Sequence, residues 1–365
     1  MNVTLEQLEL DPHPVLAQLR PIAWVEPLNG WLVTGREAAL QVMRDAETFT
    51  VDDPRFSTGR VVGPSMLTRD GPEHARHREP FAEPLRLAAV RERFAPLVRT
   101  EVDSLIDGFE ADGRAGRAEL RRSFAGPLAA SVVAQLLGLE AASTSAMLGW
   151  YDAIVASVTG VAAGKPPTEA GAAAFESLRD TVEPAHGSAV QLSSAEVVSN
   201  AAVMMFGGIE TTEGMIANLV WHLLTYVEGP VEPSLYANAV EESLRLEPAA
   251  AVIDRYATRD VELAGARIHE GDFVEISLAG ANRDPAYFPD PDRFDLHREN
   301  ARHYIAFAHG PHVCIGMHLA RLEAETAVER LFARLPGLRL DPARPSAPRG
   351  LVFRKPPTLD ALWRI

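Results

Sequence analysis

The sequence predicts a mainly α-helical protein with a minor β-sheet region, folded as a single domain over residues 1–365. Long stretches with apolar residues at helical spacing fill most of the chain. Only short segments are typical of strands, and no linker or internal repeat divides the sequence. With 47% hydrophobic residues the chain can bury a large core, although its length alone allows two domains.

The helical stretches make up most of this prediction. They span residues 93–108, 120–139, 194–227, 235–246 and 317–331. Ser193 and Glu196 form a possible capping box ahead of the third stretch, which gives a helix of roughly 50 Å at ~1.5 Å per residue. A shorter stretch at 78–87 contains Pro80 and Pro84, and we expect these prolines to break it.

Strand signals are few and lie at either end of the chain. Residues 31–34 and 273–278 read as short strands. Glycine-containing turns are predicted at 264–265 and 270–271, and Arg255 is expected to open another strand-like stretch. These segments predict a small sheet beside the helices.

Composition narrows the functional classes. A net charge of −15 disfavours nucleic acid or an anionic membrane as a partner. The single cysteine excludes an internal disulfide and suits a reducing cytoplasm. Residues 1–20, a lead-in, show no signal-peptide pattern, and no stretch approaches the ~20 apolar residues of a membrane span. We therefore expect a cytoplasmic monomer without a membrane anchor.

The one cysteine, Cys314, lies just ahead of the last helical stretch. Free N–H groups at a helix start stabilise a thiolate and lower its pKa, and haem iron is one of the few groups bound by a single such cysteine. A small buried apolar residue is the ordinary alternative. A zinc cluster of His309, His312, Cys314 and His318 is another, although its spacing does not match paired-ligand patterns.

The residues around Cys314 resemble the haem-binding motif of the bacterial cytochromes P450, which are haem-thiolate monooxygenases. The motif positions are Phe307, Gly310, His312, Cys314 and Gly316. The resemblance runs from about Trp31 to the C-terminus. It implies that Cys314 is the axial ligand of a haem b iron and that the chain adopts the fold of this family. Its two glycines allow a tight turn and a close approach to a flat group.

A second segment contains two adjacent glycines, Gly207 and Gly208, inside the long helical stretch. Each costs about 1 kcal/mol relative to alanine. Helix packing explains such glycines in one interpretation, whereas a notch beside Thr211 explains them in another. The resemblance favours the notch, as the place where dioxygen binds. It also implies that Thr211 and Glu210 form an acid–alcohol pair that delivers protons when the O–O bond breaks.

Further haem contacts follow from the resemblance. His74 and Arg78 stand four residues apart on one helical face, and with Arg255 and His312 they match the residues that bind the haem propionates. Buried carboxylates need charged hydrogen-bond partners. Each of the four, read alone, is ordinarily solvated. The remaining predicted haem contacts are Leu67, Gly208, Phe307, Ile315 and Gly316.

A buried ion network is predicted behind the thiolate. Glu242 and Arg245 are three residues apart, which by itself is typical of a surface pair. The resemblance adds Arg293 as the third member of a Glu–Arg–Arg network. Such a network holds the core, and loss of one member strands a buried charge at a cost of about 3–5 kcal/mol.

The expected substrate is a hydrophobic small molecule. By position the pocket wall is apolar, although several of its members are equally typical of plain core: Met66, Val203, Phe206, Gly207, Ala251, Val252, Val352 and Phe353. Residues 150–192, which should roof the substrate channel, are short and rich in alanine and glycine. We predict a reduced or mobile roof there.

Electrons must come from another protein, because the chain has no flavin or iron–sulfur motif. The resemblance implies a ferredoxin or flavodoxin with its NAD(P)H-dependent reductase. We predict a basic patch on this protein that binds the electron donor, although the same residues are equally typical of scattered solvated cations. The residues are Arg76, His77, Arg302, His303, His309 and Arg321. Two rival functions stay open, namely oxidative coupling or peroxide-driven oxidation, and a non-catalytic haem sensor.

Overall fold

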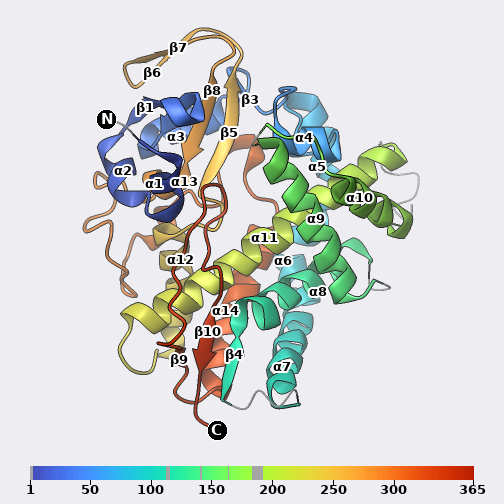
Figure 1. Ribbon diagram of the computed structural model, residues 1–365, viewed down its shortest axis with the longest axis vertical. Helices are drawn as coiled ribbons and strands as arrows, with labels where there is room; N and C mark the ends of the chain where they lie inside the picture. Colours follow the sequence, from blue (N-terminus) through green and yellow to red (C-terminus); the bar gives the residue numbers. More distant parts are fainter. Residues whose placement is uncertain (1–2, 112–115, 140–141, 163, 183–191) are drawn as a thin grey trace.

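The computed structural model describes residues 3–111, 116–139, 142–162, 164–182 and 192–365. The longer helices are α3 (Arg36–Arg44), α5 (Gly71–Ala82), α7 (Ala95–Ala111), α8 (Gly126–Leu137), α9 (Thr144–Ala162), α10 (Glu169–Thr181), α11 (Ser194–Tyr226), α12 (Tyr236–Leu246) and α14 (Met317–Arg334). Shorter helices are α1 (Leu5–Leu10), α2 (His13–Gln18), α4 (Ser57–Val62), α6 (Leu87–Ala89) and α13 (Leu278–Ala281). The predicted mainly helical fold is confirmed (Figure 1).

Helix α11 runs through the middle of the molecule and organises the core (Figure 1). The predicted capping box is present, because the Ser193 side chain accepts from the Glu196 N–H and the Glu196 side chain accepts from the Ser193 N–H. The helix is 33 residues long and contacts α8, α12 and α14. Buried apolar residues from these helices and from α7 and α9 form one large cluster. Within the described residues, no helix is both long and apolar enough to cross a membrane.

The predicted helix limits hold in most places, with one error. A π-helical turn at Arg121–Ala125 leads into α8, which ends at the left-handed Gly138. The break predicted from Pro80 is wrong, because α5 continues through Pro80 to Ala82. The α-helix ends only at Glu83–Leu85, a 3-10 turn that contains Pro84.

The main sheet has the order β1-β2-β8-β5-β3 and stands at one end of the molecule (Figure 1). Its strands are β1 (Ile22–Val25), β2 (Gly30–Val33), β3 (Phe49–Thr50), β5 (Val252–Ala257) and β8 (Phe273–Ser277). Strand β5 begins three residues before Arg255, so the expectation that Arg255 opens it was wrong. Helices α1 and α2 pack on this sheet through a separate apolar cluster.

Two smaller sheets complete the fold. Strands β6 (Val261–Leu263) and β7 (Ala266–Ile268) form a hairpin, and both residues of its turn, Ala264 and Gly265, have positive φ. Strands β4 (Arg117–Glu119), β9 (Arg339–Leu340) and β10 (Asp360–Leu362) pair in the order β4-β10-β9. This sheet brings the C-terminus beside the start of β4, far from the main sheet (Figure 1).

The predicted roof segment contains helices α9 and α10, which pack together. A Cβ atom added to Gly171 of α10 would lie 2.6 Å from Cβ of Ser157 in α9, so the absence of a side chain lets the helices approach closely. Helix α10 buries few residues, with Ala174 and Leu178 as the apolar ones. Residues 183–191 of the segment lie outside the described residues, and the mobility of the roof stays a prediction.

Candidate active site

Cys314 lies in a tight loop that leads into α14. Its backbone N–H donates to the Phe307 carbonyl oxygen at 2.8 Å, which closes the loop. Gly310 has φ +73°, and a Cβ there would overlap the backbone carbonyl of Met43 in α3. Gly316 caps α14, and a Cβ there meets nothing within 4 Å. Gly310 therefore serves the contact between the loop and α3, while Gly316 leaves open space beside the cysteine.

The environment of the Cys314 thiol differs from the sequence prediction. Burial raises its pKa, and this outweighs the lowering by the Gly316 and Met317 N–H groups and by the guanidinium groups of Arg78 and Arg321. The lowering that we expected from the helix start is therefore present, and burial offsets it. The side chain is nevertheless exposed. The thiol is therefore accessible from outside the protein, although the surrounding protein raises its pKa.

The zinc alternative has no structural support. In the parts of the chain that the structure describes, no group of three or more His, Cys, Asp or Glu side chains is arranged to hold a metal ion. His312 turns instead towards a different cluster, in which its ring centroid lies 4.3 Å from that of His74.

The four residues predicted to bind propionates lie in one cluster. Arg78 donates to the Val313 carbonyl oxygen at 2.6 Å, beside the cysteine. Arg255 is buried, and its Nη1 donates to the Asp254 carbonyl oxygen at 2.7 Å. Burial, together with the nearby positive groups of His312 and Arg78, lowers the pKa of His74 to about 4. The cluster is thus a desolvated group of cations and neutral histidines.

Asp70 is a member of this cluster that the sequence analysis missed. Its Oδ1 lies 2.7 Å from His312 Nε2, while Oδ2 accepts from Thr50 Oγ1 at 2.6 Å and the Val51 N–H at 2.9 Å. Burial raises the pKa of Asp70, but the hydrogen bonds from His312, Thr50 and Val51 lower it to about 2. Asp70 is the N-cap residue of α5, yet its side chain makes no capping bond, so both of its carboxylate oxygens are used within this cluster.

The two glycines of α11 have different roles. A Cβ on Gly207 would meet nothing within 4 Å, whereas a Cβ on Gly208 would lie 2.5 Å from Cγ2 of Val133 in α8. Gly208 therefore serves helix packing, and only Gly207 leaves open space. Thr211 lies one turn later, and its Oγ1 donates to the Gly207 carbonyl oxygen at 2.5 Å. The predicted notch is thus formed by one glycine.

Glu210 is buried and forms an ion pair that the sequence analysis did not anticipate. Its Oε1 lies 2.7 Å from Nζ of Lys355, which comes from the C-terminal segment. Lys355 also pairs with Glu213, the next acidic residue of α11. No local signal joins residues so far apart in sequence.

Comparisons with known proteins agree with this geometry. A family model for cytochrome P450 matches residues 234–357. The cytochrome P450 monooxygenase PikC of Streptomyces venezuelae is 34% identical over 96% of this chain and 89% of PikC. The mycinamicin IV hydroxylase/epoxidase of Micromonospora griseorubida is 32% identical over 95% and 94% of the two chains. The structure of CalO2 superposes with a TM-score of 0.85 and 29% identity, over 99% of this chain and 97% of CalO2.

The chain is a cytochrome P450. It is therefore an oxidoreductase of the monooxygenase class, and the family implies a haem group and the use of O2. The residues present fit a haem. The buried Nε2 of His74 has no hydrogen-bond partner in the described residues. Arg78 and Arg255 provide permanent positive charge, and the carboxyl groups of Asp70 and Asp254 lie near Arg255. This donor set suits a buried dianion such as the two haem propionates.

In this cytochrome P450 the predicted ion network has a different third member. Glu242 and Arg245 are fully buried and paired at 2.7 Å. The second arginine is Arg298, whose Nε donates to Glu242 Oε1 at 2.9 Å. The prediction of Arg293 is wrong, because its side chain is exposed and only its carbonyl oxygen accepts from Arg245 and Arg298.

The remaining predicted site residues are divided between the site and the core. Phe206 and Phe353 pack edge to face with centroids 5.4 Å apart. Ala251 and Val252 instead lie in the cluster that packs against α1 and α2. Met66 and Val203 are buried, whereas Val352 is exposed. The other expected haem contacts, Leu67, Phe307 and Ile315, are partly buried beside the main core.

Proposed function

We propose that this cytochrome P450 holds haem b on Cys314 and inserts one oxygen atom from O2 into a hydrophobic small molecule, by hydroxylation or epoxidation. The observation that carries the proposal is the position of Thr211. Its hydroxyl lies beside the open face of Gly207, and the preceding residue is the buried acid Glu210. The aromatic pair Phe206–Phe353 supplies apolar surface for the substrate. When bound, the haem supplies the dioxygen activation, and the chain supplies the protons and the positioning.

Each site residue has a separate task in this proposal. Arg78, Arg255, His74 and His312 bind and orient the propionates. The Thr211 hydroxyl donates to the Gly207 carbonyl oxygen, and its oxygen accepts a hydrogen bond from a water that supplies the proton. Glu210 is an ionisable group that returns protons to this position. Relatives named for mycinamicin IV and nocardicin C support a substrate from secondary metabolism.

The test is oxygen incorporation under substrate turnover. Compounds that change the iron from low to high spin are selected first, and turnover then uses a surrogate ferredoxin, its reductase, NADPH and labelled O2. One labelled oxygen atom in the product is expected. Thr211→Ala should lower product formation about 10-fold or more and release more hydrogen peroxide. Unlabelled coupled product, full turnover on peroxide alone, or no NADPH use with any bound compound would each contradict the proposal.

The electron donor is proposed to dock beside the cysteine loop, with a smaller set of cations than the sequence predicted. His77 is fully buried and bonded to Asn200, so it cannot contact a partner. Arg76 and Arg321 are engaged by carboxylates, Glu196 and Glu241 respectively. His309 is half-buried, which leaves two exposed members of the predicted patch, Arg302 and His303. Arg302 also pairs with Glu241 at 3.3 Å, but its side chain stays 70% exposed.

An acidic ferredoxin or flavodoxin, with its NAD(P)H-dependent reductase, fits these positive groups. Arg302→Glu should slow haem reduction several-fold at low ionic strength, and the difference should shrink as salt is added. Arg267→Glu is the matched control, because Arg267 is equally exposed but lies on the β6–β7 hairpin. Equal reduction rates for both variants would contradict this docking site.

A further inference from the structure

The C-terminal segment Phe353–Lys355 lies along α11 and is fixed there by its backbone. Asn218 Nδ2 donates to the Arg354 carbonyl oxygen at 2.9 Å, and the Arg354 N–H donates to the Ala249 carbonyl oxygen at 2.8 Å. Lys355 exchanges two backbone hydrogen bonds with Arg349. These bonds fix the backbone of Lys355 beside the turn of α11 that contains Glu210.

The Lys355 ammonium group joins two carboxylates of α11. It lies 2.7 Å from Glu210 Oε1 and also pairs with Glu213. Like charges three residues apart on a helix repel, so a cation between them stabilises both. In the described chain no protein donor contacts Oε2 of Glu210, which leaves this oxygen available for a hydrogen bond from water.

Two glycines make room for this cluster. A Cβ on Gly214 would lie 3.5 Å from Cδ of Lys355 and 3.0 Å from Cβ of Ala249. A Cβ on Gly126, at the start of α8, would lie 3.0 Å from Glu213 Oε1. The space that holds the cluster is therefore shaped by residues of three separate segments.

Glu213 links the buried end of the cluster to two arginines. Its carboxylate is fully buried, 3.3 Å from Arg121 Nε and 3.7 Å from Arg122 Nη1. Glu213 Oε1 and Arg121 Nε are both buried without a hydrogen-bond partner among the described residues. A bridging water would satisfy both atoms, and such waters commonly pair with buried polar groups.

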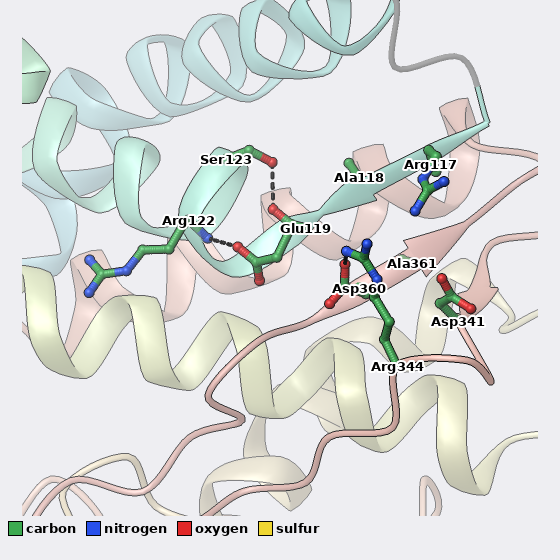
Figure 2. Close-up of a pocket in the computed structure, with 9 residues that line it drawn as sticks. All are labelled: Arg117, Ala118, Glu119, Arg122, Ser123, Asp341, Arg344, Asp360 and Ala361. Carbon is green, nitrogen blue, oxygen red and sulfur yellow. Dashed lines mark hydrogen bonds and ion pairs between the residues drawn. The ribbon is translucent and has the colours of Figure 1, made fainter.

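Arg122 connects this cluster to the surface. It lines a cleft of about 540 Å³ beside β4 and β10, and its side chain extends from the edge of that cleft (Figure 2). The Arg122 side chain is 44% exposed, whereas that of Glu213 is 0% exposed. The Arg122 N–H donates to Glu119 Oε2 at 2.8 Å, which holds the Arg122 backbone at the edge of the cleft.

We propose that Lys355 is a positioning residue for Glu210, and that the cluster supplies protons to Glu210 from the cleft beside β4. The inference rests on the proposed relay role of Glu210. One proton enters from water in the cleft, passes through water beside Glu213 to the Glu210 carboxylate, and leaves from Glu210 towards Thr211. Lys355 and both arginines keep their protons throughout.

The test compares Lys355→Met, which keeps the length of the stem, with Lys355→Arg, which restores the charge. Lys165→Met is the control, because Lys165 is exposed and the only other lysine in the sequence. During turnover, Lys355→Met should raise the peroxide share several-fold and enlarge the solvent deuterium isotope effect, and Lys355→Arg should recover most of the parent behaviour. Arg122→Gln should change the isotope effect in the same direction by a smaller factor.

A second readout does not depend on turnover. The unfolding midpoints of the haem-loaded parent, Lys355→Met, Glu210→Gln and the double variant form a cycle. Lys355→Met should lower the midpoint by about 5 °C or more, and the double variant should recover part of this loss. Additive midpoints, or parent-like coupling in Lys355→Met, would overturn the positioning role. An unchanged isotope effect in Arg122→Gln would overturn the cleft as the proton source. If no substrate is oxidised, the proposed function fails, and the midpoint cycle still decides whether Lys355 holds Glu210.

Discussion

Arg298 Nε donates to Glu242 Oε1 at 2.9 Å, and this bond joins the loop after the main sheet to α12. Glu242 also accepts from Arg245 and from the Asp295 N–H. Arg298 in turn donates to the carbonyl oxygens of Pro289 and Asp290. One buried carboxylate thus organises the irregular chain that precedes the cysteine loop.

The first prediction concerns the two arginines of this loop. Arg298→Ala should lower the free energy of unfolding by about 3–5 kcal/mol, because it leaves the buried Glu242 with less compensation. Arg293→Ala, five residues earlier and exposed, should change it by less than about 0.5 kcal/mol. Chemical denaturation and haem content of the purified variants measure both. Equal losses would show that the side chain of Arg293 belongs to the network after all.

The second prediction separates the two glycines of α11. Gly208→Ala should destabilise the fold by about 1–3 kcal/mol, since the new Cβ overlaps Val133. Gly207→Ala meets no neighbour and should stabilise the helix by up to about 1 kcal/mol, yet it fills the space beside Thr211 and should reduce substrate oxidation. Thermal unfolding and turnover, measured on both variants, should therefore move in opposite directions for Gly207→Ala. A fully active Gly207→Ala variant would contradict the notch.

The third prediction is a pH dependence of stability. Glu275 and Asp254 face each other across β8 and β5. Burial raises the pKa of Glu275, and the charge of Asp254 raises it further; burial also raises the pKa of Asp254. The folded state therefore holds these protons more tightly than the unfolded state. The stabilisation is present below the ordinary carboxyl pKa and is lost as pH rises through the folded pKa.

Glu275→Gln removes this loss. The variant should gain stability over the parent between about pH 5 and about pH 8, as read from denaturant midpoints. Glu262→Gln, an exposed position on β6, is the control and should follow the parent. A parent whose stability rises over this range, with Glu275→Gln unchanged, would refute the assignment.

The fourth prediction concerns the roof. Helix α10 buries little apolar surface, whereas α8 buries residues along most of its length. Backbone amides of residues 169–181 should therefore exchange with deuterium faster than those of 126–137. Hydrogen exchange followed by mass spectrometry compares the two helices in one sample. Equal protection would contradict a mobile roof.

The sequence was informative where a local pattern determines the structure. The Ser193–Glu196 capping box and the apolar period placed α11 almost to the residue. The run from Phe307 to Gly316 identified the cysteine loop, because its motif positions lie close together in the sequence. His74, Arg78, Arg255 and His312 also converge as predicted.

The errors share a physical cause, namely contacts between distant segments. An irregular loop has no period, so spacing alone did not distinguish Arg293 from Arg298. Lys355 meets Glu210 only because the C-terminal segment returns along α11, and Gly208 is explained by Val133 of α8. The pKa of Cys314 depends on how much protein surrounds it, which a sequence pattern does not record.

The most direct test of the account is the carbon monoxide difference spectrum of the reduced protein, recorded for the parent chain and for Cys314→Ser. The parent should show the long-wavelength Soret band that a thiolate ligand produces, and Cys314→Ser should lose that band. The far-UV circular dichroism spectrum of Cys314→Ser should match that of the parent, which shows that the variant is folded. A parent that takes up no haem, or a Cys314→Ser variant with the parent spectrum, would contradict the central claim.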